Sequence, residues 1–371
     1  MSTLTLATTF TACGFAALYA YFRRARTLLD KLPPTTKRVR LLEGAAILAD
    51  AKFELSEVPL KPPGFGEVVI KVEASAVNPS DYGGCRAGNA SKNLGNECSG
   101  TVVATGGGLS TAGLLGAPCF AHVAGIGGYA EYATVPARTV TRLPTNIPVE
   151  DGCAFFINPF TVYAMLQQVK THNQKYVVHT AAASVLGQML VKASKKFEIE
   201  VINVVRREEQ AECLRALGAT HVLVSSSESF WQDLHGLIER YKIKIAFDAL
   251  GGEYTGALMK CLPPDSTVYV YGRLQSSTVD ALPTVEMIYH NKRVEGFLVM
   301  RALASHGIRG TPFGLYRASW FVKRHFAELF LPPKFEDVPL EGVADLFGRI
   351  DPHGANPVAV TGCKYRVRPW M

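Results

Sequence analysis

The sequence has no pair of cysteines separated by two residues, although it contains eight cysteines in 371 residues. This absence excludes a zinc ribbon and a thioredoxin-type redox site, which both depend on such pairs. Scattered cysteines of this kind are typical of free thiols in a reducing compartment. The sequence also lacks internal repeats and low-complexity tracts, so solenoid and fibrous architectures are excluded.

Most of the chain has no excess of positive or negative charge. Residues 1–40 hold seven Lys or Arg side chains and a single acid, Asp30, so the other 331 residues contribute only +1 to the formal net charge of +7. A nearly neutral body lacks the basic surface that binds phosphate backbones, which excludes nucleic acid as a main partner. Because 48% of the residues are hydrophobic, a chain of this length can form two or three domains with large cores.

The amino-terminal segment differs from the rest. Residues 2–22 contain no charged side chain, a length sufficient to cross a bilayer, and the arginine-rich flank Arg23–Arg26 follows. This order favours an uncleaved signal anchor over a secretory signal, whose positive charge comes first. A mitochondrial presequence is a second interpretation, since no acid precedes Asp30, and a soluble tail is a third. We expect residues 1–34 to be an anchor or targeting segment with its linker, and the protein to be mitochondrial and membrane-associated.

Two kinds of hydrophobic pattern divide the body. Up to about Ile157, short β-branched runs are interrupted by Gly and Pro, which is typical of an irregular β domain. After Pro159, strands and helices alternate to about Val299, which predicts a doubly wound parallel sheet. The expected β-domain strands include Glu67–Val72, Gly100–Thr105 and Gly128–Val135. The later strands are expected at Val177-Val178, Val201–Val205, His221–Val224, Ile243–Phe247 and Thr267–Tyr271, and the helices near Leu186–Ala193, Glu208–Leu217, Glu228–Tyr241 and Tyr254–Cys261.

The first strand-to-helix turn of such a sheet is where the backbone approaches a dinucleotide pyrophosphate. The spacing of the G-x-G-x-x-G fingerprint falls here on Ala182, Ser184 and Gly187, so only the third glycine is kept. Small residues still permit close approach of a ligand, although a tight turn packed for its own sake has the same pattern. The expected contacts are Ala182, Ala183, Ser184, Val185, Leu186 and Gly187.

Arg206 and Arg207 begin nineteen residues after Gly187, at the end of the next predicted strand. An acid near this position holds the ribose 2′-hydroxyl of NAD, whereas a cation suits the 2′-phosphate of NADP. Two arginines at the positive end of a helix dipole are unfavourable without an anion. The pair therefore predicts NADPH as the cofactor, with a solvated pair of charges as the plainer alternative.

Further motifs occur in a fixed order along the body. They are Val77–Asp81, Gly95–Gly100, Gly128–Tyr132, Asn158–Tyr163, Leu217–Ala219, Asp248–Gly252, Tyr271-Gly272 and Glu295–Phe297. In this order they resemble the zinc-free branch of the medium-chain dehydrogenase/reductase superfamily, which includes quinone oxidoreductases and mitochondrial enoyl-thioester reductases. The zinc alcohol dehydrogenases of the superfamily carry a Cys near Ser80-Asp81, a His at the Asn96 position and a four-cysteine loop. None of these occurs here, so the resemblance implies a site without metal.

The resemblance implies an α/β fold with two domains. Residues 35–157 and 301–371 would form a GroES-like, partly open β-barrel that carries the catalytic groups. Residues 158–300 would form an inserted Rossmann domain with a doubly wound parallel sheet that binds NADP(H). The carboxyl-terminal run would supply returning strands at Val358–Val360 and Tyr365–Val367.

The resemblance also implies the chemistry. Hydride adds to the β-carbon of a double bond conjugated to a carbonyl, and a hydroxyl group then supplies a proton. Asn78 and Thr161 match family positions, and Tyr82 is the nearest candidate proton donor, because a phenol stays protonated at neutral pH. Enoyl-thioester reductases carry Gly-Asn-Tyr where this chain reads Gly88-Asn89-Ala90, and a packing role for Tyr82 is the alternative. The resemblance adds Tyr271, Gly272, Phe297 and Leu298 to the cofactor contacts.

We therefore expect an NADPH-dependent reductase of activated C=C bonds, acting on an enoyl thioester or a quinone-like acceptor. The alternative is an accessory subunit of a mitochondrial membrane complex that keeps the reductase fold and nucleotide site with little or no turnover. The expected anchor and the missing Gly-Asn-Tyr tyrosine support this alternative. Other partners compatible with the sequence are a second copy of the chain and the subunits of such a complex.

Overall fold

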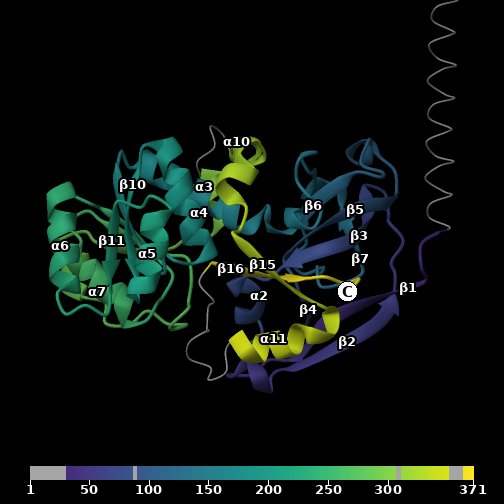
Figure 1. Ribbon diagram of the computed structural model, residues 1–371, viewed down its shortest axis with the longest axis horizontal. Helices are drawn as coiled ribbons and strands as arrows, with labels where there is room; N and C mark the ends of the chain where they lie inside the picture. The colour runs from purple at the N-terminus through teal and green to yellow at the C-terminus, as the bar shows by residue number, and fades with distance from the viewer. Residues whose placement is uncertain (1–30, 87–89, 306–310, 351–361) are drawn as a thin grey trace, which may run out of the picture.

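The computed structural model describes residues 31–86, 90–305, 311–350 and 362–371, so the expected anchor at residues 2–22 and the strand expected at Val358–Val360 lie outside the described residues. None of the helices in these ranges is long and apolar enough to span a bilayer. Figure 1 shows two units side by side along the long axis of the molecule: a sheet surrounded by helices, and a unit made mostly of strands.

The first unit contains the predicted doubly wound sheet. All its strand pairs are parallel, and the strand order is β11-β10-β9-β12-β13-β14. The order reverses between β9 and β12, the place where such sheets bind ligands. Its strands are β9 Tyr176–His179, β10 Glu200–Val205, β11 His221–Val224, β12 Ile245–Asp248, β13 Thr267–Val270 and β14 Arg293–Gly296. Its helices are α3 Ile157–Thr171, α4 Val185–Ser194, α5 Glu208–Ala216, α6 Phe230–Tyr241, α7 Glu253–Cys261 and α8 Thr284–Tyr289.

The strand predicted at Ile243–Phe247 begins two residues later. Lys242 adopts a left-handed conformation with φ of 51°, and the N–H of Ile243 donates to the carbonyl of Ile238 at 3.1 Å. This bond ends α6 in the manner of a left-handed helix cap. Ile243 is fully buried under the helix end, so its apolar character reflects packing of the cap rather than a strand.

The second unit combines segments from both halves of the chain. Its larger sheet has the order β15-β16-β3-β5-β6-β8 with β7 on β3, and a smaller sheet has the order β2-β1-β4. The yellow strands near the carboxyl end lie beside the blue strands of the first half (Figure 1). Its elements are β1 Thr35–Glu43, η1 Leu48–Asp50, β2 Lys52–Pro59, β3 Glu67–Ala76, α2 Pro79–Gly83, β4 Ala90–Asn93, β5 Glu97–Thr105, β6 Pro118–His122, β7 Tyr132–Pro136, β8 Val140–Arg142, β15 Lys334–Val338, α11 Val343–Ile350 and β16 Cys363–Val367.

The strand β16 is held by several contacts. It pairs antiparallel with β3, where Arg366 lies opposite Ala76. Just after the strand, the indole N–H of Trp370 donates to the carbonyl of Val72 at 2.6 Å, and the Lys71 ammonium lies 4.7 Å from the indole ring centre. The barrel-like unit is therefore complete only when residues from both chain halves are in place.

Packing of the first unit continues beyond residue 300. The helices α9 Val299–Ser305 and α10 Thr311–His325 and the π-helical turn Phe326–Phe330 follow β14. Leu303, Val322 and Phe326 belong to the same hydrophobic cluster as the sheet residues Phe247 and Tyr269. These helices cover the face of the sheet that also packs against α3.

Candidate functional site

The carboxyl edge of the parallel sheet gathers the residues expected to bind the cofactor. The turn Ala182–Gly187 follows β9, and Arg206-Arg207 follows β10. Tyr271-Gly272 follows β13, and Phe297-Leu298 follows β14. Because parallel strands end at the same edge, segments that are far apart in the sequence meet at the switch point between β9 and β12.

The turn after β9 has the shape and polarity that an anion requires. Ala182 and Ala183 are buried, and a Cβ at Gly187 would lie 2.1 Å from the carbonyl oxygen of Ala182, so the start of α4 presses directly against the turn. Ser184 caps α4 by accepting the N–H of Gly187 at 3.1 Å. The first helical N–H groups have no acceptor within a helix, and they point toward the ligand side. The turn therefore fits the pyrophosphate of a dinucleotide.

A buried aspartate holds this turn in place. Asp248, the last residue of β12, accepts hydrogen bonds from the hydroxyls of Thr180 at 2.8 Å and Thr255 at 2.6 Å. It also accepts the backbone N–H groups of Leu250 and Gly251 at 3.0 and 3.1 Å. Four donors on one fully buried carboxylate connect the turn after β9, the loop after β12 and the helix α7.

Arg206 and Arg207 lie exposed just after β10, the strand next to β9. Their backbone N–H groups both donate to the side-chain oxygen of Gln210, at 3.1 and 3.2 Å. The Arg207 guanidinium approaches Glu209 at 3.8 Å, whereas the Arg206 guanidinium has no ion pair within the described ranges. The backbone is thus fixed while Arg206 is free to contact a ligand anion.

The other expected cofactor residues divide between the edge and the core. Phe297 packs edge-on against Phe247, with ring centres 5.2 Å apart, in the hydrophobic cluster between the sheet and α3. Leu298, with 57% of its surface exposed, lies beyond the strand end. A Cβ at Gly272 would lie 2.8 Å from the carbonyl oxygen of Ala249, so the loops after β12 and β13 touch here.

A buried polar network in the second unit was not predicted from the sequence. The Lys364 ammonium donates to the Asn78 side-chain oxygen at 2.5 Å, and the Asn78 amide donates to Glu97 at 2.8 Å. The other oxygen of Glu97 accepts the N–H groups of Phe156 and Ile157, at 3.2 and 2.9 Å, where α3 begins. The network therefore ties β16, the start of α2 and the start of α3 together.

A second carboxylate completes this network. Asp81 accepts the N–H of Asn78 at 2.7 Å and the N–H of Asn96 at 3.0 Å. Burial, together with the nearby Glu97 charge, raises the pKa of Asp81 to about 7. Burial also raises the pKa of Glu97 and lowers the pKa of Lys364. The Lys364 ammonium is thus the charge that stabilises both carboxylates, which repel each other.

The three expected catalytic residues have different surroundings. The Asn78 side chain is 1% exposed, and both ends of its amide are used within the network, so it positions its neighbours. The Thr161 hydroxyl donates to the carbonyl of Ile157 at 2.7 Å in the first turn of α3. Tyr82 lies in α2 and packs edge-on against Phe347 of α11, with ring centres 6.1 Å apart. Its role as the proton donor stays a prediction.

The two units meet where α2 faces the sheet edge. The Arg273 guanidinium, two residues after Tyr271, donates to the carbonyl of Gly83 at the end of α2. Glu97 joins the start of α2, through Asn78, to the start of α3. These bonds therefore bring α2 against the carboxyl edge of the sheet and join it to the first turn of α3.

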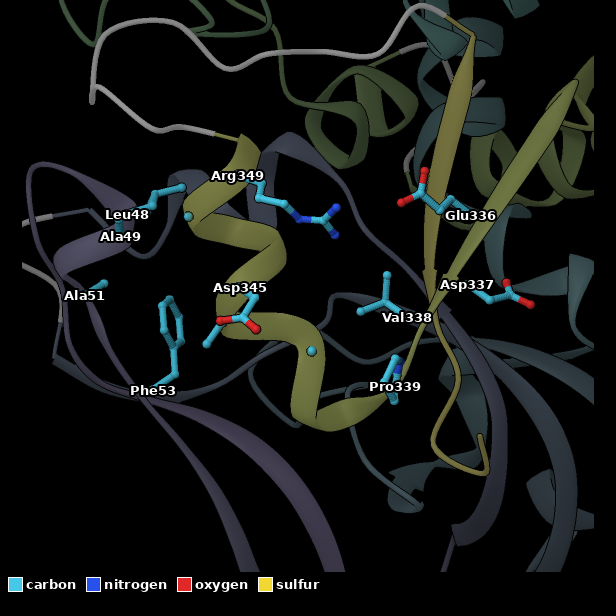
Figure 2. Close-up of a pocket in the computed structure, with 13 residues that line it drawn as sticks. Leu48, Ala49, Ala51, Phe53, Glu336, Asp337, Val338, Pro339, Asp345 and Arg349 are labelled. Carbon is cyan, nitrogen blue, oxygen red and sulfur yellow. The ribbon is translucent and has the colours of Figure 1, made fainter.

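A separate cavity of about 810 Å³ lies in the strand-rich unit, between η1, β2, β15 and α11. Figure 2 shows Arg349 of α11 extending toward the strand that carries Glu336, with Val338 on the same side of the helix and Phe53 on the opposite side. None of the expected catalytic or cofactor residues lines this cavity. The cavity is therefore distinct from the carboxyl edge of the parallel sheet.

Two family models match the two units in turn. The alcohol dehydrogenase GroES-like domain matches residues 64–145, and the domain described as zinc-binding dehydrogenase matches residues 185–309. The chain belongs to the medium-chain dehydrogenase/reductase superfamily. Within the described ranges, no three His, Cys, Asp or Glu side chains are grouped so that they could hold a metal ion.

Relatives of this chain include proteins named as reductases. The mitochondrial enoyl-[acyl-carrier-protein] reductase of Xenopus tropicalis is 28% identical over 259 residues, covering 67% of this chain and 73% of the relative. The human protein of the same name is 24% identical over 272 residues, covering 68% and 70%. The crystal structure of a putative NADPH:quinone reductase from Mesorhizobium loti is 25% identical with a TM-score of 0.76, covering 91% of this chain and 99% of that one.

Proposed function

We propose that this protein is an oxidoreductase that uses NADPH to reduce a carbon–carbon double bond conjugated to a carbonyl. The observation that carries the proposal is the sheet edge itself. A turn that fits a pyrophosphate lies beside Arg206, whose guanidinium has no ion pair in the described part of the chain. The names of the relatives support a reductase, and an enoyl thioester is the preferred substrate class.

The chain's own residues have distinct tasks in this reaction. Bound NADPH supplies a hydride. The turn Ala182–Gly187 and Arg206 hold the two phosphate-bearing parts of the cofactor, while Asp248 keeps the turn rigid. The network around Glu97 fixes α3, which carries Thr161, against α2. A tyrosine hydroxyl at this junction supplies the proton, and Tyr82 is the residue expected from the sequence.

A panel of acceptors tests the function. The purified full-length protein should consume NADPH over many turnovers with crotonyl thioester, and less rapidly with a quinone, which the similarity to the Mesorhizobium loti structure makes the second candidate. NADPH consumption followed by absorbance is the measurement. Tight NADPH binding without turnover on any acceptor would instead support the accessory-subunit alternative.

We also propose that residues 2–22 attach the protein to a mitochondrial membrane. The support is the uncharged run followed by Arg23–Arg26, together with the mitochondrial names of the relatives. Carbonate extraction of mitochondria should leave the full-length protein in the membrane pellet, because a spanning helix resists alkaline washing whereas surface contacts do not. A variant lacking residues 1–34 should be recovered in the supernatant. Release of the full-length protein would contradict the anchor.

A further inference from the structure

A histidine and a tyrosine form a hydrogen-bonded pair at the strand ends that precede the turn Ala182–Gly187 and the loop after β13. His179 is the last residue of β9, and Tyr271 follows the last residue of β13. The Nε2 atom of His179 lies 2.7 Å from the Tyr271 hydroxyl oxygen. The rings are nearly parallel, with an angle of 18° between their planes and 5.7 Å between their centres. Tyr271 is among the residues that the sequence predicts to contact the cofactor, whereas His179 is not.

The protonation of His179 follows from its surroundings. Its side chain is fully buried, and burial lowers its pKa to about 3, so the imidazole is neutral near pH 7. The Nδ1 atom has no hydrogen-bond partner among the described residues. A neutral imidazole has one N–H and one bare nitrogen. A buried N–H without an acceptor is rarer than a buried acceptor without a donor, which favours the tautomer that carries its hydrogen on Nε2.

This tautomer decides what the tyrosine can do. With the hydrogen on Nε2, His179 donates to the Tyr271 oxygen, and the phenol proton remains free to be donated elsewhere. Burial raises the pKa of Tyr271, so the phenol keeps its proton at neutral pH. Tyr271 is partly exposed and lies two residues before Arg273, which contacts Gly83 of α2.

Tyr82 is placed less suitably than Tyr271 to donate a proton at the sheet edge. Tyr82 is 9% exposed and belongs to the hydrophobic cluster of β1 and α11, with Leu41, Leu346 and Phe347. Its ring thus packs into the strand-rich unit. The His179 and Tyr271 pair stands at the strand ends where the cofactor turn begins.

We propose that Tyr271 is the proton donor of the reduction and that His179 is a positioning residue that holds its hydroxyl. This inference rests on the reductase function proposed above. Once hydride has added to the β-carbon, the electrons of the double bond move to the carbonyl and give an enolate. The α-carbon then forms a bond to the Tyr271 proton as the O–H bond breaks. The phenolate that remains accepts a hydrogen bond from His179 Nε2–H, and water returns the proton.

Four variants of the full-length protein test this assignment with crotonyl thioester and NADPH. Tyr271→Phe should lower turnover about 10²–10⁴-fold, the usual contribution of a positioned acid, with NADPH affinity by fluorescence titration little changed. His179→Leu should lower turnover roughly 10- to 150-fold, whereas His179→Gln, which keeps an N–H donor, should recover most of it. Tyr241→Phe, a matched change at the far end of α6, should have no effect.

A measurement without cofactor or substrate tests the hydrogen bond itself. Nitrogen NMR of the unmutated protein should show His179 neutral with its hydrogen on Nε2, and the signal should change in Tyr271→Phe. A hydrogen on Nδ1 would overturn the proposal, because the Tyr271 hydroxyl would then donate its hydrogen bond to Nε2 of His179. A larger loss of turnover in Tyr82→Phe than in Tyr271→Phe would also overturn it.

The reductase function and the role of Tyr271 as proton donor can be disproved separately. If the unmutated protein turns over and Tyr271→Phe turns over equally well, only the assignment of the proton donor is wrong. If the unmutated protein binds NADPH but reduces no acceptor, the proposed function is wrong and the role of Tyr271 with it.

Discussion

Replacing Lys364 with methionine should lower the free energy of unfolding by about 3–5 kcal/mol, the cost of removing one partner from a buried ion cluster. Lys364 is 4% exposed, and its ammonium is the positive charge that faces Asn78, Glu97 and Asp81. Without it, two carboxylates remain in a site that excludes water. Urea unfolding followed by circular dichroism measures the effect.

A matched pair of controls separates burial from charge. Lys61 also contacts a glutamate, Glu67 at 3.1 Å, but its side chain is 70% exposed. Lys61→Met should therefore change the stability by less than about 1 kcal/mol. Adding Glu97→Gln to Lys364→Met should restore part of the loss, since it removes an uncompensated charge. Equal effects of the two lysine variants would contradict the buried network.

The second large effect concerns the cofactor. Arg206→Asp should weaken NADPH binding by about 1.5–3 kcal/mol, roughly 10- to 150-fold, because a hydrogen bond to a charged group is lost and a like charge faces the 2′-phosphate. NADH affinity should not fall, since its ribose has a hydroxyl at that position. Isothermal titration calorimetry with both nucleotides gives the two affinities.

The control for this variant changes the same charge elsewhere. Arg240 is exposed near the end of α6, which leads into β12 and so lies at the amino edge of the sheet. Arg240→Asp should leave NADPH binding nearly unchanged. Equal affinities of the unmutated protein for NADPH and NADH would show that Arg206 and Arg207 do not select the phosphate.

The alternating half of the fold could be predicted closely from the sequence because its signals are local. His221–Val224 is a strand as expected, and the helix expected at Tyr254–Cys261 begins one residue earlier at Glu253. The strand expected at Gly128–Val135 begins only at Tyr132. A Cβ at Gly127 would lie 2.6 Å from the Cβ of Asn93, so this glycine allows the loop before β7 to pack closely against the end of β4.

The site was predictable only where one segment carries the signal. The nucleotide turn and the arginine pair each occupy a short stretch with a known spacing, and both lie at the expected edge. The buried network joins Lys364 to Asn78, which are 286 positions apart, and no local pattern marks a lysine inside a strand as buried. The pair of His179 and Tyr271 comes from two strands that are not neighbours in the sheet. These groups meet only because distant strands align in the folded chain, and no short stretch of sequence specifies that alignment.

The place of β16 in the sheet has a consequence for biosynthesis. Residues up to Phe330 complete the sheet of parallel strands and its helices, so this part can fold while translation continues, as domains usually do. The strand-rich unit begins earlier in the chain but cannot close until β16 pairs with β3. During this interval only the end of β3 at Ser75 and Ala76 lacks its strand partner, because β5 and β7 already pair with the rest of β3. The nascent chain therefore passes through a state in which the half with the parallel sheet is finished and the strand-rich half still lacks its last strand, the stage at which a chaperone would have the greatest effect on yield.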